Sequence, residues 1–274
     1  RTVRNEPSFC FGTASTRVAV TRRGGMMAPV TFFADSAAPV EPYYIAPWAD
    51  AGAPPDTIPM LAALRGDFFC APFGENDEPH EGVLHPPHGE PCAGDWVCDA
   101  LRESAGGASI EMHFDLRGIP GRIRKQLSVR SGESVIYSCH TLEGMRGAMP
   151  LAHHPILFVP ESAGQGYLSF SPHDGAWVYP DDPAPGGCSA LKPGAPIDDL
   201  RACPTLAGGT ADLTRYPARR GCEDIVLLHS RRDLAFAWSA SSLPSLGYVW
   251  FSLKDPRVLE STMLWMSNGG LPAS

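Results

Sequence analysis

Short runs that alternate apolar and polar residues, separated by turns rich in glycine and proline, constrain the fold of this chain most. The clearest run spans residues 109–116. It turns Ile110, Met112 and Phe114 to one face, and His113 on the other face is expected to meet water. A period of two residues is that of a strand with one buried face, whereas a helix needs a period near 3.6. The pattern therefore predicts antiparallel β-structure.

Similar runs recur along the whole chain. Strands are expected at residues 17–21, 26–33, 64–74, 96–102, 109–116, 122–130, 134–142, 149–159, 167–170, 176–179, 225–228, 234–240, 247–253 and 261–267, and one short helix at 58–64. Turn signals separate them, including ArgArgGlyGly after residue 21 and HisAspGly after residue 172. Residues 180–220 lack periodicity and are expected to form a long loop or lid.

Many strands and almost no helix indicate a large all-β antiparallel sandwich. A chain of 274 residues fits one such domain, covering residues 1–274. A jelly roll or a propeller is the alternative, although nothing repeats at the period that a propeller requires.

Charge and composition exclude several classes of function. The formal net charge of −8 argues against a nucleic-acid partner, because phosphate binding needs a concentrated basic face. No apolar run is long enough to cross a membrane. The eight cysteines are widely and irregularly spaced, so reduced thiols and a cytoplasmic location are expected. The common nucleotide-binding and serine-hydrolase motifs are absent, and no cofactor is expected.

One segment combines residue types that can carry chemistry. Residues 85–96, HPPHGEPCAGDW, hold two histidines, a cysteine and a tryptophan among three prolines and two glycines. Prolines and glycines at this density predict an irregular loop that presents side chains. A surface crossing with solvated histidines is the plain alternative. A metal site in a cupin-like fold is another, but the HxxH spacing does not suit it, and no metal is expected.

A second histidine pair lies at residues 153 and 154. Adjacent residues of a strand point to opposite faces, so both imidazoles cannot enter one cleft. We expect one of them to be functional, with a hydrogen-bonded histidine at a sheet margin as the alternative.

Several of these segments together resemble the galactose mutarotase-like family of sugar epimerases. His88-Gly89 followed by Trp96 is similar to the HG(x)6W loop of its hexose-phosphate branch, and RGDFFCAPFG resembles the strand that carries its substrate-binding arginine, here Arg65. HHPILF resembles its second histidine motif and selects His154, whereas GCEDIVLL offers Asp224 as the acidic residue. An arginine that often follows HisGly in the phosphate branch is absent.

The resemblance implies a β-supersandwich and an aldose 1-epimerase (mutarotase)-like isomerase of carbohydrate metabolism. It implies that His154 is the acid at the ring oxygen, that His88 is an orienting donor, and that Arg65 and Asp224 bind sugar hydroxyls. Trp96 is expected either to offer a face to the sugar ring or to pack in the core. The implied partner is a small sugar, an aldose that is free or phosphorylated.

The general base is not accounted for by this resemblance. Relatives carry a glutamate on a strand shortly after the segment that resembles LWMSNGG, so the domain is expected to be incomplete at its C-terminus. Glu90, Glu223 and Glu260 are the substitutes within the chain. A non-catalytic carbohydrate-binding protein on the same fold is the alternative function.

Overall fold

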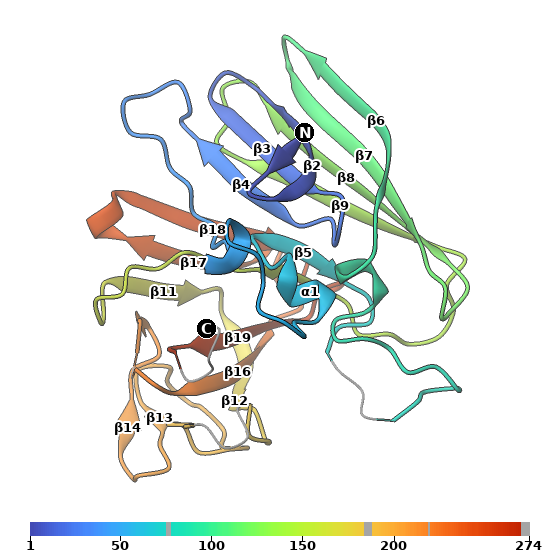
Figure 1. Cartoon of the computed structure of the whole chain (residues 1–274). Coiled ribbons are helices and arrows are strands. Elements are labelled where there is room, and N and C mark those ends of the chain that lie inside the picture. The colour runs from blue at the N-terminus through green and yellow to red at the C-terminus, as the bar shows by residue number, and fades with distance from the viewer. Residues whose placement is uncertain (75–77, 184–187, 219, 270–274) are drawn as a thin grey trace. The chain divides into compact units, whose positions relative to one another are not determined.

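The computed structural model of this chain describes residues 1–74, 78–183, 188–218 and 220–269 (Figure 1). The contacts gather in two compact units, Arg1–Phe158 and Val159–Ser274. Strands are the main regular secondary structure of both units, so the prediction of an all-β antiparallel protein is confirmed. That the whole chain is one domain stays a prediction. None of the helices in the described ranges has the length and hydropathy of a membrane span.

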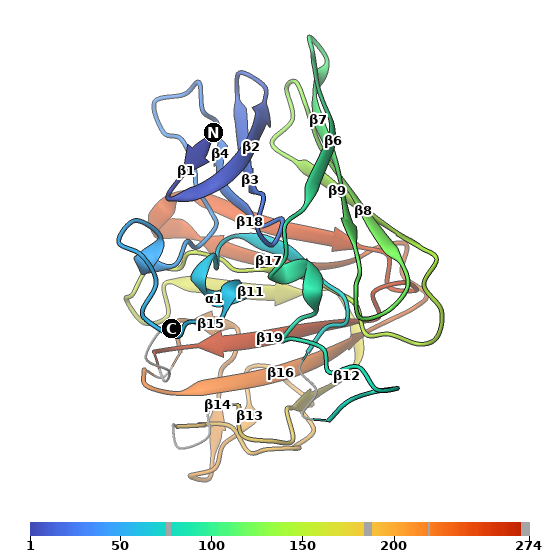
Figure 2. The ribbon, with the colours of Figure 1, turned by 45° about the vertical axis from the view of Figure 1, so that its right-hand side comes forward.

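Two antiparallel sheets build the first unit. The six-stranded sheet has the order β1-β2-β3-β4-β5-β10, with β1 (Thr2–Val3), β2 (Glu6–Gly12), β3 (Thr16–Thr21), β4 (Met27–Phe32), β5 (Asp67–Cys70) and β10 (Ala152–Pro155). The other sheet has β6 (Val97–Ser104), β7 (Gly107–Asp115), β8 (Arg122–Arg130) and β9 (Ile136–Glu143) in chain order, and Figure 2 shows these as long green strands. The helical segments of this unit are short: η1 (Pro47–Ala49), α1 (Pro59–Ala62) and η2 (Glu90–Cys92).

The core of the first unit lies between these two sheets. Ile110, Met112 and Phe114 of β7 are buried there as the alternation predicts, opposite apolar residues of β2, β3 and β4. The inward positions of β8 follow the same period, and one of them is Lys125. The first unit is therefore a sandwich whose core contains one lysine.

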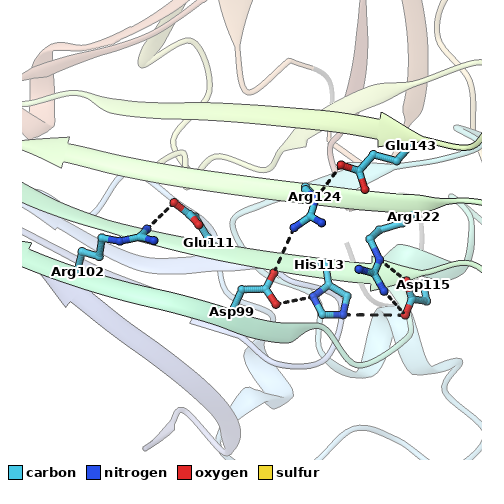
Figure 3. A network of polar contacts seen from close by, with 8 residues as sticks. All are labelled: Asp99, Arg102, Glu111, His113, Asp115, Arg122, Arg124 and Glu143. Carbon is cyan, nitrogen blue, oxygen red and sulfur yellow. Dashed lines mark hydrogen bonds and ion pairs between the residues drawn. The ribbon is translucent and has the colours of Figure 1, made fainter.

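Charged side chains cover the outer face of the β6–β9 sheet (Figure 3). His113 Nδ1 lies 2.7 Å from Asp99 Oδ1, and Arg124 bonds Glu143 at 2.7 Å. His113 is on the outer face as predicted, but its side chain is only 15% exposed because these neighbours crowd it. Each cross-strand pair of this kind on a solvent-exposed sheet face contributes little to stability.

The second unit contains three sheets. The four-stranded sheet has the order β15-β11-β17-β18, with β15 (Arg215–Tyr216), β11 (Gly166–Phe170), β17 (Ala237–Leu243) and β18 (Tyr248–Lys254). The three-stranded sheet has the order β12-β16-β19, with β12 (His173–Val178), β16 (Glu223–Ser230) and β19 (Ser261–Ser267). A small pair joins β13 (Cys203–Pro204) and β14 (Thr210–Ala211), and η3 (Pro244–Leu246) connects β17 to β18.

Two predictions for this unit are wrong. HisAspGly is not a turn: it opens β12, which bulges between His173 and Gly175 and pairs with β16, whereas β11 pairs with β15 and β17. The thiols are also not all reduced, because Cys188 and Cys222 form a disulfide. The expected loop at residues 180–220 contains only two-residue strands where the structure describes it, and residues 184–187 and 219 of that stretch lie outside the described residues.

Candidate functional site

His154 lies on β10, next to β5. It is paired in register with Phe68, and its ring stacks on the Phe68 ring with centroids 4.6 Å apart and planes 10° apart. His153 is paired with Phe69 and contacts the Phe69 ring edge-on at 5.3 Å. Because alternate residues of both strands point to opposite faces, the two histidines have different surroundings, as predicted.

The loop at residues 85–96 packs its backbone closely against β5. His88 and Gly89 both have positive φ values, 60° and 83°. A Cβ at Gly89 would lie 2.1 Å from the carbonyl oxygen of Ala71, so only glycine fits there. The Cys92 thiol donates toward the His88 carbonyl oxygen at 3.0 Å. The loop is irregular apart from η2, as expected, and its backbone holds His88 in place.

These two elements bring His88 and His154 together. Their ring centroids are 5.1 Å apart, and the planes meet at 68°. Phe73 stacks on His88 at 5.2 Å. The amide of Gly74 donates to His88 Nδ1 at 3.4 Å, which leaves Nε2 as the protonated nitrogen of a neutral ring. Two imidazoles flanked by Phe68 and Phe73 form the candidate site.

Burial sets the charge of this pair. Desolvation, with a smaller contribution from His88, lowers the pKa of His154 to about 4. Desolvation also lowers the pKa of His88. Burial disfavours the imidazolium form, so both rings are neutral near pH 7 and each carries one N–H donor. The acceptor nitrogen of His88 already receives the Gly74 amide.

Arg65 lies two residues before β5 and is 1% exposed. Its guanidinium donates to three backbone carbonyl oxygens, those of Ala63 at 3.2 Å and of Val3 and Arg4 at 3.1 Å each. These bonds tie the N-terminal strand to the segment that precedes β5. The role predicted for Arg65, binding a sugar, stays a prediction.

Trp96 is buried in the core of the first unit. It is 1% exposed, its indole N–H donates to the Pro91 carbonyl oxygen at 2.9 Å, and the Lys125 ammonium lies 5.1 Å from its ring centroid. Of the two alternatives left by the sequence, these contacts are those of a core residue. The ring would need to move to contact a sugar.

Asp224 belongs to the second unit. Its Oδ1 accepts the amides of Ala190 and Leu191 at 3.1 and 2.9 Å, which fastens the chain near the disulfide to β16. A sugar-binding role for Asp224 stays a prediction.

The three glutamates considered as the base have structural contacts. Glu90 accepts the amides of Arg117 and Gly118 at 2.9 and 2.7 Å, and Glu223 accepts the indole N–H of Trp265 at 2.6 Å. Glu260 pairs with Arg232 at 3.0 Å. In the described ranges no group of three or more His, Cys, Asp or Glu side chains is placed to hold a metal ion.

A second polar cluster, which was not predicted from the sequence, lies on the opposite side of the β5–β10 pair. The rings of His140 and His153 are 4.7 Å apart, and His140 stacks on Phe69 at 4.0 Å. Burial raises the pKa of Asp67 and lowers the pKa of Lys125 to about 8. Only the inward register of Lys125 between Ile123 and Leu127 could have signalled this cluster in advance.

Comparison with known proteins identifies the fold. No family model matches the sequence, and no curated protein does. Among solved structures, the chain is similar to a candidate aldose 1-epimerase from Escherichia coli K12, with a TM-score of 0.54, 13% identity and coverage of 96% of this chain and 90% of that one.

Two further structures agree with this result. The candidate mutarotase YeaD from Salmonella typhimurium has a TM-score of 0.54 at 13% identity, over 83% of this chain and 66% of that one, so this chain spans just under two thirds of YeaD. The GalM/aldose epimerase homologue from C. elegans has a TM-score of 0.50 at 9% identity, over 85% and 78% of the two chains. The chain therefore has the galactose mutarotase-like β-sandwich fold.

Proposed function

We propose that this chain interconverts the anomers of an aldose by opening and closing the sugar ring, with His154 and His88 as its catalytic residues. The observation that carries the proposal is the imidazole pair with centroids 5.1 Å apart, held by β10 and the loop at residues 85–96. The fold shared with candidate mutarotases supports a sugar as the substrate, although fold alone does not fix function.

Ring opening releases the proton of the anomeric hydroxyl to water while water supplies a proton to the ring oxygen, and closure reverses both transfers. A neutral His154 near pH 7 can polarise the ring oxygen by donating a hydrogen bond, as neutral imidazoles do toward carbonyl oxygens in other enzymes. His88 would orient the sugar with the N–H on Nε2. The resemblance implies that His154 acts at the ring oxygen as an acid; here we propose that it acts there as a neutral hydrogen-bond donor that keeps its proton.

A non-catalytic carbohydrate-binding protein is the second candidate. The observation in its favour is that both carboxylate oxygens of Glu90 accept backbone amides, while Glu223 is fixed by the Trp265 indole. Hydrogen bonds to the protein thus occupy both carboxylates. For the proposed epimerase we also expect a cytoplasmic location and an aldose substrate that can be phosphorylated.

Exchange of anomers, followed by NMR across free and phosphorylated aldoses, tests the proposal. His154→Gln should slow exchange by about 10²–10⁴-fold, the usual contribution of a positioned proton donor. His153→Gln is the matched control, because it changes the neighbouring residue on the other face of β10, and it should retain most of the activity. Equal losses, or a larger loss in His153→Gln, would contradict the assignment. Saturable binding without exchange would establish the second candidate.

A further inference from the structure

Four large side chains are exposed on one face of the β12–β16–β19 sheet. Trp177 and Tyr179 are exposed by 43% and 37%, and Met263 and Trp265 by 40% and 45%. Their strand neighbours Ala176, Val178, Leu264 and Met266 lie on the opposite face, in or against the core of the second unit. Single exposed apolar residues are ordinary, but four on one sheet face form a patch that calls for a ligand or partner.

The pairing register makes the patch continuous. Leu227 of β16 is paired with Trp177 on one side and with Met263 on the other. Ile225 is paired with Trp265 and accepts the backbone amide of Tyr179 at 2.8 Å. The four side chains therefore occupy two adjacent rows across the same three strands. We call this set, Trp177, Tyr179, Met263 and Trp265, the aromatic platform.

The Trp177 ring lies flat along its own strand, over Gly175. A Cβ at Gly175 would lie 2.3 Å from Cη2 of the indole and 2.8 Å from Cζ2. These distances leave no room for any side chain at Gly175, so the glycine allows the ring to lie against the sheet. An indole in this orientation turns one of its faces outward.

The Trp265 ring is fixed by a buried carboxylate. Its indole N–H donates to Glu223 Oε2 at 2.6 Å, and the Ser267 hydroxyl donates to Oε1 at 3.2 Å. Glu223 has no exposed surface, whereas Trp265 is 45% exposed. A charge-assisted hydrogen bond to a buried partner restricts the orientation of an exposed ring. Glu223 is thus a positioning residue for Trp265.

We propose that the aromatic platform is a carbohydrate-binding surface of the second unit. A pyranose has a flat face of C–H groups with hydroxyls at its edge, and pre-oriented indoles with a polar end match it. Apolar walls with a few fixed polar groups are typical of small-molecule sites. The choice of a saccharide, rather than another apolar partner, rests on the proposed function.

In the described ranges, another exposed apolar face of this unit does not combine a ring that lies over a glycine with an indole held by a buried carboxylate. Val249, Phe251 and Leu253 alternate along β18 and are exposed by 59%, 49% and 58%. This face also carries aromatic rings, including Phe251 and Trp238, but in the described ranges the Trp238 indole donates to no buried carboxylate, as that of Trp265 does. Trp238, paired with Leu253 and 36% exposed, provides a matched control on that sheet.

The spacing of the strands also indicates the size of the ligand. Trp177 and Trp265 belong to strands on either side of β16, whose backbones are about 10 Å apart at the usual strand separation. A ligand that contacts both indoles must be longer than one pyranose ring. We therefore expect disaccharides to bind more tightly than the corresponding monosaccharides.

Titration of tryptophan fluorescence and calorimetry with glucose, galactose, maltose, cellobiose and lactose test the proposal on the full chain. Trp177→Ala and Trp265→Ala should each weaken binding of the tightest saccharide by about tenfold or more, and Trp238→Ala should leave it unchanged. Gly175→Ala is a sharper probe, because its Cβ displaces the Trp177 ring while the ring itself is retained. It should weaken binding about as much as Trp177→Ala.

Near-UV circular dichroism confirms that each variant is folded. The proposal is overturned if no saccharide of the panel binds, if Gly175→Ala and both platform variants bind normally, or if Trp238→Ala loses as much affinity as they do. Self-association that Trp177→Ala abolishes, without saccharide binding, would assign the platform to a second copy of the chain and overturn the proposal too. Anomer exchange is assayed separately on the wild type. Saccharide binding that Trp177→Ala weakens, without anomer exchange, would support the platform and refute the proposed function, whereas exchange without such binding would do the reverse.

Discussion

Acidification should destabilise this protein through His154, and the replacement His154→Gln should remove the effect. Burial lowers the pKa of His154 from 6.5 to about 4, a change worth about 3 kcal/mol at 1.36 kcal/mol per pKa unit. Above pH 6.5 the ring is neutral in both the folded and the unfolded chain. As the pH falls from 6.5 toward 4, the unfolded chain takes up the proton first, so the free energy of unfolding decreases.

Urea unfolding of the wild type and of His154→Gln between pH 7 and pH 4 measures this contribution. Gln also loses the stacking on Phe68 at 4.6 Å, which lowers the stability of the variant by a similar amount at every pH. The informative quantity is therefore the difference in the free energy of unfolding between the two proteins. Between pH 7 and pH 4 this difference should shift by about 3 kcal/mol in favour of the variant. Parallel stability curves would refute the inference that His154 stays neutral in the folded chain.

Three other replacements test the structural roles assigned above by chemical or thermal unfolding. Trp96→Ala should lower the free energy of unfolding by about 3–5 kcal/mol, the usual range for removing a buried tryptophan, because Trp96 is 1% exposed. A small loss of stability with a large loss of sugar affinity would instead support the sugar-binding alternative. Arg65→Met should cost at least about 2 kcal/mol, because three backbone carbonyls lose charged donors; unchanged stability would leave substrate binding as its role. Cys222→Ala should lower the free energy of unfolding by about 3–4 kcal/mol, the loop-closure value for a sequence separation of 34 residues. Equal melting temperatures of the variant and the oxidised wild type would contradict the disulfide.

Many strands could be located from the sequence because one face of each strand is buried. The alternation at residues 109–116 requires Ile110, Met112 and Phe114 to face inward, and the structure places them in the core. A one-residue shift of register would expose all three, so the pattern is a strong constraint. The same logic could have identified Lys125 as an inward residue.

Other features depend on contacts that a local pattern cannot contain. HisAspGly has the composition of a turn, but Gly175 is needed within β12 to make room for the Trp177 ring. The Cys188–Cys222 disulfide joins positions whose spacing does not specify a partner. His88 and His154 could be matched to motifs, yet their neutrality results from burial against Phe68 and Phe73, which only the folded chain shows.

NMR of the histidine side chains during titration with a saturating aldose tests the location of the proposed sugar site most directly. Each imidazole signal can be assigned by its loss in the corresponding Gln variant. The account predicts that the signals of His88 and His154 shift together on binding, whereas those of His140 and His153, on the opposite side of the β5–β10 pair, remain in place. Shifts at His140 and His153 with an unchanged His154 would contradict it.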